Sequence, residues 1–160
     1  MNVTGKKELR LEELKNIISR LKLAESSFEY SKSRCRAIGL KEVFSFEELD
    51  VFEALTARFA RISDMLTQKL LTIIFILLKE NPLTTIDKIN LAEKFGIIKS
   101  AEDLLAIREL RNEISHEYKS EDINVMFREI LKMSDILSEE AARAKKYAED
   151  KFGVTLDNAK

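Results

Sequence analysis

The sequence has little that breaks or bends a chain, with four glycines and one proline among 160 residues. It also has one cysteine, one histidine and no tryptophan. Turns between strands need Gly, Pro or Asn, so this scarcity favours long helices over sheets. Cys35 has no partner in the chain for a disulfide, and Cys and His are too few for a zinc site. These counts favour a reducing, cytoplasmic setting, with no metal or other cofactor.

Long hydrophobic runs and an excess of charge of one sign are also lacking. The longest apolar run, "LLTIIFILL" at Leu70 to Leu78, is too short to span a bilayer and indicates core, so no membrane partner is expected. The first 15 residues carry charges of both signs and lack the apolar stretch of a signal peptide. With 27 basic against 28 acidic residues, any contact with RNA must come from a local patch or groove. The basic runs at 32–36 and 143–146 are interpreted as solvated helix faces.

Apolar residues spaced three and four apart predict helices over most of the chain. The first is expected from about residue 7 to 38, with Gly39 as its stop. A capping box of Ser45 and Glu48 opens the second, which should continue to Asn81-Pro82. Its expected core stripe is Phe52, Leu55, Phe59, Ile62, Leu66, Leu70, Ile73 and Leu77.

Three more helices are expected in the second half of the chain. A short one covers 86–95, with Thr85 as a cap and Gly96 as its stop. Ser100 with Asp103 opens the next, and Ser120 caps a last long helix over about 121–151. The expected stripe of the last helix is Ile123, Phe127, Ile130, Leu137, Ala141, Ala144 and Ala148. The predicted fold is an all-α, antiparallel up-down bundle of four long helices and one short one, in a single domain over 1–160.

The segment "RNEISHEY", residues 111–118, contains the only histidine, one of three tyrosines and an arginine. On a regular helix over 101–118, at about 100° per residue, Arg111 falls on the apolar stripe of Leu104, Ile107 and Ile114. His116 then points roughly 140° away from Arg111. The two side chains can meet only if the helix unwinds near Ser115, or if a second copy completes the site across a twofold axis.

An arginine on a core-facing stripe is costly unless a carboxylate, a phosphate or a wet cleft receives it. One interpretation is a purely structural buried pair with Asp64 of the long second helix. The other is phosphodiester chemistry, because histidine moves protons near neutral pH and arginine holds a phosphate with its forked guanidinium. Spacing alone favours the structural interpretation for Arg111, and a surface or capping role for His116.

The pattern Arg-(four residues)-His-x-Tyr, with asparagine after the arginine, resembles the signature of the HEPN superfamily, specifically of HepT-like toxins and their relatives. The stretch "AEKFGIIKSAEDLLAIRELRNEISHEY" also has that family's order of short helix, turn and motif helix. The resemblance implies a helical homodimer whose paired motifs line a cleft between protomers. It further implies metal-independent ribonuclease activity toward an RNA substrate.

The resemblance also implies roles for individual residues. Arg111 would hold the scissile phosphate and His116 would act as general acid or base, while Asn112 would orient the motif or the substrate. Tyr118 matches the tyrosine to which a cognate nucleotidyltransferase antitoxin adds AMP. For the acidic or polar residue that the family often has on the preceding long helix, position suggests Asp64. An alternative function is a non-catalytic subunit that binds a nucleotide or substrate for a nucleotidyltransferase, and a third possibility is a purely structural helical dimer.

Overall fold

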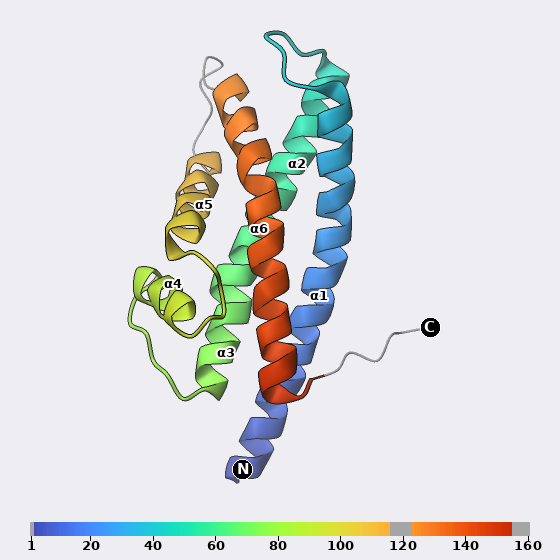
Figure 1. Cartoon of the computed structure of the whole chain (residues 1–160). Helices are drawn as coiled ribbons and strands as arrows, with labels where there is room; N and C mark the ends of the chain where they lie inside the picture. The colour runs from blue at the N-terminus through green and yellow to red at the C-terminus, as the bar shows by residue number, and fades with distance from the viewer. Residues whose placement is uncertain (1, 116–122, 155–160) are drawn as a thin grey trace.

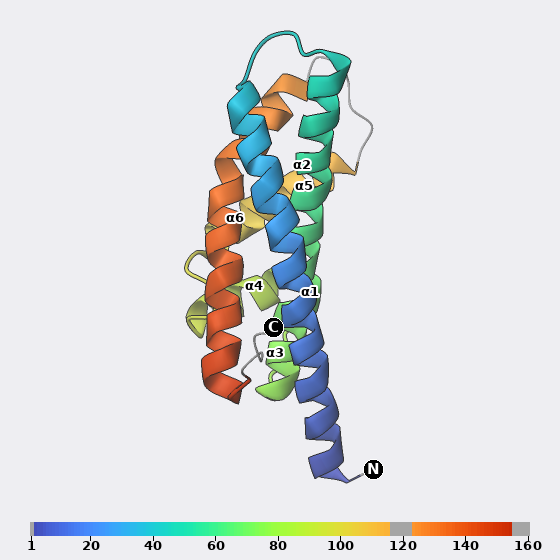
Figure 2. The same ribbon diagram turned by 90° about the vertical axis from the view of Figure 1, so that its right-hand side faces the viewer.

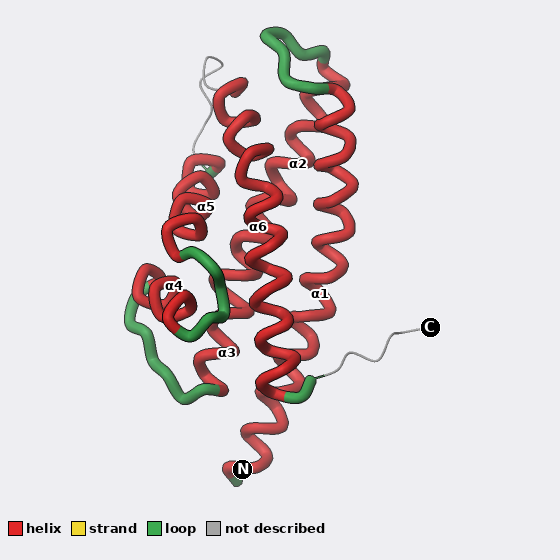
Figure 3. Tube along the Cα trace, in the orientation of Figure 1, coloured by secondary structure: helices red, strands yellow, loops and turns green. Residues whose placement is uncertain are grey.

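A computed structural model describes residues 2–115 and 123–154, and all regular structure in those ranges is helical (Figures 1 and 3). The elements are α1 (Val3–Ile38), α2 (Phe46–Asp64), η1 (Met65–Leu70), α3 (Leu71–Leu77), α4 (Thr85–Lys94), α5 (Ala101–Ile114) and α6 (Ile123–Phe152). α2, η1 and α3 follow each other without a break and form one rod, called here the central rod. The all-α prediction is confirmed, with α1, the central rod and α6 packed together along their lengths (Figure 2).

The prediction of four long helices is wrong for α5, which has 14 residues in the described part of the chain. It lies with the short α4 against one side of the three long helices (Figure 1). The carboxylate of Glu140 on α6 positions the start of α5. It accepts hydrogen bonds from the backbone N–H groups of Lys99 and Ser100, with N···O distances of 3.0–3.3 Å. Glu140 itself is only 3% exposed. A buried carboxylate at a helix N-terminus satisfies free N–H groups and the helix dipole together.

Side-chain caps begin several helices. Ser45 and Glu48 form the predicted reciprocal capping box at α2, and the Ser100 side chain accepts the N–H of Asp103 at α5. At α4 the cap is Thr84, not Thr85 as predicted. Thr84 has extended backbone and exchanges two hydrogen bonds with Asp87, at 3.0 and 3.2 Å. A capping box needs an acceptor three residues after the cap, and Thr85 has a lysine there.

The central rod ends at Leu77, four residues before the predicted stop at Asn81-Pro82. The N–H of Lys79 donates to the carbonyl of Ile76, and the N–H of Glu80 donates to that of Phe75. This is a Schellman motif with Lys79 at the left-handed position, φ +58°. Because lysine occupies the left-handed position that glycine usually takes, no glycine in the sequence marks the end of this helix. Gly39 and Gly96 have φ +78° and +73° and end α1 and α4 as predicted.

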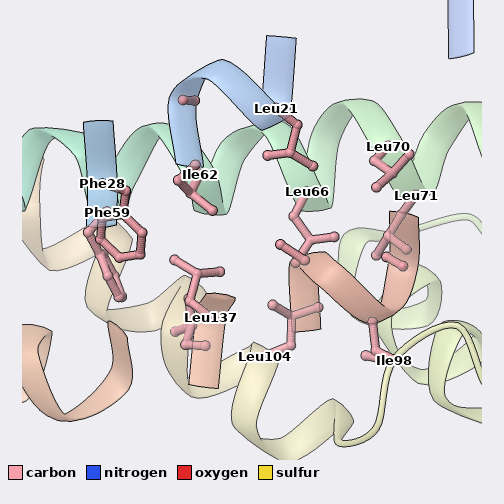
Figure 4. Packing of buried hydrophobic residues seen from close by; sticks show 14 of the residues in the cluster. Leu21, Phe28, Phe59, Ile62, Leu66, Leu70, Leu71, Ile98, Leu104 and Leu137 are labelled. Atoms are coloured by element: carbon pink, nitrogen blue, oxygen red, sulfur yellow. The ribbon is translucent and has the colours of Figure 1, made fainter. Parts of the chain in front are cut away.

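The core lies where α1, the central rod, α5 and α6 face one another, as the labelled side chains of Figure 4 show for Leu21, Leu66, Leu104 and Leu137. The predicted stripe of the rod is buried except for Leu77, which is partly exposed. On α6 the alanines Ala141, Ala144 and Ala148 have no exposed surface. Small residues at these positions therefore let α6 pack closely against its neighbours. In the described ranges, no helix is both long enough and apolar enough to cross a bilayer.

The two basic runs form ion pairs between helices. Lys32 is 2% exposed and donates to Asp135 at 3.1 Å, and Arg36 donates to the same carboxylate at 2.8 Å. Arg36, and then Lys32, hold the pKa of Asp135 below its usual range. Lys145 pairs with Glu25 of α1. The expectation of solvated faces is therefore wrong for Lys32 and Lys145, which join α1 to α6.

Cys35 is fully buried, and its Sγ lies 3.6 Å from the carbonyl oxygen of Val51. Burial raises the pKa of this thiol to about 11, and the thiolate is the reactive form. We therefore expect a maleimide at pH 8 to leave the folded protein unmodified and to label Cys35 fully in denaturant. Mass spectrometry over time measures both. Rapid labelling of the folded protein would mean that the contact between α1 and α2 opens readily.

Candidate functional site

The central rod changes its hydrogen-bond pattern immediately after Asp64. Met65–Leu70 form a π-helix, in which the N–H of Leu71 donates to the carbonyl of Leu66 instead of that of Thr67. Lys88 of α4 compensates, because its Nζ donates to the Thr67 carbonyl at 3.1 Å and to Thr72 Oγ1 at 2.9 Å. Burial lowers the pKa of Lys88, and the nearby Arg108 lowers it further. π-helical turns are frequent at functional sites, and this one borders the site described next.

The expected contact between Arg111 and Asp64 is present. Arg111 Nε donates to Asp64 Oδ1 at 2.7 Å, and Nη2 donates to Oδ2 at 2.8 Å, a bidentate pair between α5 and the end of α2. Its Nη1 donates to Ser115 Oγ at 2.6 Å. The hydrogen bonds with Asp64 raise the pKa of Arg111 above its already high value. The guanidinium is thus permanently charged and held in one orientation.

Arg111 is less buried than the helical wheel predicted. The buried residues of α5 are Ala101, Leu104, Ile107 and Leu110, whereas Ile114 is only partly buried. The buried stripe therefore ends beside Arg111, whose side chain is 26% exposed, and Asp64 is 43% exposed. The prediction that Arg111 is buried is wrong: its direction falls between those of Leu104 and Ile107, but it lies in the last turn of α5, where its side chain is only partly buried. The pair lies at the edge of the bundle, in contact with solvent.

The guanidinium keeps capacity for a ligand. It has five N–H bonds, and Asp64 and Ser115 accept three of them. No described residue accepts the second N–H of Nη1 or of Nη2. A phosphate oxygen that reaches them gains charge-assisted hydrogen bonds without displacing Asp64.

The pair lies in a groove of about 770 Å³ between the central rod and α5. Among the described residues that line it, Asp64 is the only acid and four are cationic: Arg61, Lys69, Arg108 and Arg111. Within the described ranges, Arg61, Lys69 and Arg108 form no salt bridge. Gln68, Asn112 and Ser115 add polar groups. The groove, called here the basic groove, is chemically suited to an anion, and in particular to one with several phosphates.

The structure brings together only part of the predicted site. Arg111, Asn112 and Asp64 all line the basic groove. His116 and Tyr118 lie outside the described residues, and with them the predicted angle between His116 and Arg111. The sequence interpretation missed Arg61, Lys69 and Arg108. Arg61 and Gln68 lie three residues before and four after Asp64, so a helical wheel drawn around Asp64 would have pointed to them.

The described residues contain no group of three or more His, Cys, Asp or Glu side chains that could hold a metal ion. Comparison of the chain with protein-family models, with curated proteins and with solved structures finds no match. What the site does must therefore be argued from its own side chains. These offer positive charge, N–H donors and an oriented arginine.

Replacing Lys88 by methionine should destabilise the fold. The change removes the donor of the Thr67 carbonyl, and an unsatisfied backbone acceptor costs about 1–2 kcal/mol of unfolding free energy. Urea denaturation measures this loss. Lys94→Met is the matched control, because Lys94 is exposed on the same helix and should change stability by less than about 0.5 kcal/mol. Equal stability of the two variants would contradict the assigned role of Lys88.

Arg111→Ala should cost only about 1 kcal/mol of unfolding free energy, because solvent reaches both members of the pair. A structural buried pair would cost about 3–5 kcal/mol. A double-mutant cycle with Asp64→Ala, measured by urea denaturation, isolates the pairwise coupling. Coupling well above 1 kcal/mol would support the structural interpretation instead.

Proposed function

We propose that this chain is a HEPN-type, metal-independent endoribonuclease of a toxin–antitoxin pair, active as a homodimer and neutralised by a nucleotidyltransferase antitoxin. The observation that supports this most is the position of Arg111. Its guanidinium is oriented by Asp64, has two N–H bonds that no described residue accepts, and lies in a groove whose described lining holds four cations and one acid. A pair that served only stability would gain little from a solvated, basic surrounding. A pair that presents arginine to a phosphodiester needs such a surrounding.

In the proposed reaction, Arg111 binds the scissile phosphate and stabilises the charge that builds on its oxygens. The ribose 2′-hydroxyl attacks the phosphorus, and the bond to the 5′-oxygen breaks. His116 either takes the proton of the 2′-hydroxyl or gives one to the departing 5′-oxygen, and solvent water makes the other proton transfer. The products are a 2′,3′-cyclic phosphate and a free 5′-hydroxyl, and no metal takes part.

The remaining groups of the groove have supporting roles in this proposal. Asp64 fixes the plane of the guanidinium, and Asn112 orients substrate at the rim. Arg61, Lys69 and Arg108 receive the neighbouring phosphates of the RNA strand, so that binding weakens with salt. Addition of AMP to Tyr118 by the antitoxin would put a bulky phosphorylated group seven residues after Arg111 in the sequence. Its negative charge would compete with RNA for the same cations.

The size of the basic groove favours a second candidate, a non-catalytic subunit that holds a nucleotide for a nucleotidyltransferase. A volume of about 770 Å³ falls in the range of small-molecule sites. On this alternative, the cations bind the phosphates of a single nucleotide, and the protein expressed alone does not affect cell growth. Growth arrest that depends on His116 distinguishes the ribonuclease from this alternative.

The purified protein should cleave RNA in the presence of a chelator and leave 2′,3′-cyclic phosphate ends. His116→Ala should lower the rate at least about 100-fold, since general acid–base catalysis contributes that much. Arg111→Lys keeps the charge but loses the fork, and should also be strongly impaired. Gel analysis of labelled RNA measures the rates, with Lys94→Met as a surface control that retains full activity.

Equal absence of cleavage in wild type and His116→Ala would contradict the ribonuclease, provided that mass spectrometry shows Tyr118 unmodified. If such an inactive protein still binds ATP or another nucleotide, and Arg61→Ala weakens that binding, the nucleotide-binding alternative gains support.

A further inference from the structure

A second hollow, of about 880 Å³, runs along the outer face of α1, where α1 meets the central rod. It is called here the α1 groove. Two of its leucines are unusually open for apolar side chains: Leu9 is 55% exposed and Leu23 is 75% exposed. Ile17, Ala24 and Met65 form its apolar floor, and Glu12, Glu13 and Arg20 stand along it. α1 lies at the front of the molecule in Figure 2.

The exposed residues of this face follow the spacing of a helix that packs against another helix. Leu9, Asn16 and Leu23 are seven residues apart, so they lie nearly in line along α1 at steps of about 10 Å. Leucine occupies two of these three positions and charged residues lie between them, so this line of heptad-spaced positions can face another helix. In such pairs a single asparagine in the apolar line fixes the register. All three residues are exposed in the protomer.

The pattern is complementary to itself when α1 is turned end to end. A twofold axis at Asn16 places residues that are equally distant from Asn16 opposite each other. Leu9, seven residues before it, then meets Leu23 of a second copy, and Glu12, four before it, meets Arg20 of that copy. The two Asn16 amides face each other at the axis and can exchange hydrogen bonds. Within the described ranges Arg20 forms no salt bridge, and the cation nearest Glu12 is Lys15 at 4.0 Å.

We propose that a second copy of this chain occupies the α1 groove, with the two α1 helices antiparallel about an axis at Asn16. The α1 groove shares Arg61, Met65 and Lys69 with the basic groove. The partner subunit therefore borders the basic groove and contributes to the wall beside these three residues. The inference rests on the proposed function only in taking a homodimer as the active assembly. The proposed register is argued from residues of α1 alone.

A charge swap tests the register. Glu12→Arg and Arg20→Glu each place like charges opposite each other at two symmetric positions, so each should weaken the dimer about tenfold or more. The double variant restores both attractions with reversed sign and should return close to the wild-type dissociation constant. Sedimentation equilibrium at low salt measures all four proteins. Dimers of equal strength in all four would overturn the proposed surface.

Substitution of an exposed leucine tests the apolar contact. Leu23→Glu should abolish the dimer and leave the fold intact, because the side chain is already 75% exposed in the protomer. Leu83→Glu is the matched control, since Leu83 is 86% exposed and lies outside the α1 groove. The control should stay dimeric. Circular dichroism confirms that both variants fold, and loss of the dimer in both or in neither would contradict the proposal.

A cysteine at the axis gives a test that does not depend on affinity. Asn16→Cys should form a disulfide with its own copy under mild oxidation and give a covalent dimer on a non-reducing gel. Lys15→Cys, which is also exposed but points about 100° away, should not. The buried Cys35 adds no background. A wild-type monomer without the Asn16→Cys crosslink would overturn the proposal. RNA cleavage assayed separately shows whether the proposed function fails as well.

Discussion

The central rod is the constraint on which the rest of the fold depends, because α2, η1 and α3 together contact every other helix. The direction of each side chain on the rod decides where its neighbours lie. The π-helical turn at Met65–Leu70 adds one residue to that turn and rotates everything after it. After it, the buried positions include Leu70 and Leu71 and also Ile73 and Ile74. A lysine from α4 satisfies the carbonyl that the rotation frees, and so the change in phase also positions α4.

Much of the fold could be predicted from the sequence because local rules and packing agree. Examples are the apolar stripe from Phe52 to Ile73, which is buried, and the capping box of Ser45 and Glu48, which begins α2. The π-helix could not be predicted, because the run "LLTIIFILL" that follows it has apolar residues on every side of the helix, and its sequence is therefore compatible with a shift in helical phase. The Schellman motif at Lys79 was missed for a different reason. It consists of backbone hydrogen bonds with a lysine in the left-handed conformation, which costs little free energy. The glycine that usually marks such a helix end in a sequence is not present.

In the candidate site too, residue spacing predicts some features, whereas others depend on how the helices pack. Spacing identified Arg111 and suggested Asp64, because a cation beside an apolar stripe needs a carboxylate within reach. It placed the pair too deep, since a helical wheel gives direction but not how far a neighbouring helix extends. α5 buries Leu110 and leaves Arg111 at the edge. That difference changes the chemistry: a buried pair neutralises itself, whereas an exposed pair keeps N–H bonds for a ligand. The cations around it were invisible to composition, because the net charge of −1 averages over the whole surface.

The two grooves share a wall, which would couple the proposed dimer to anion binding in the basic groove. Arg61, Met65 and Lys69 project from the central rod between α1 and α5, so each touches both hollows. A partner helix on the α1 side would shield Arg61 and Lys69 from water and counter-ions, which strengthens their attraction for an anion in the basic groove. Linkage requires the reverse as well: an anion that binds these cations better in the dimer than in the monomer must also tighten the dimer. The α1 surface and the Asp64–Arg111 pair would then act as one unit, although no residue of α1 lines the basic groove.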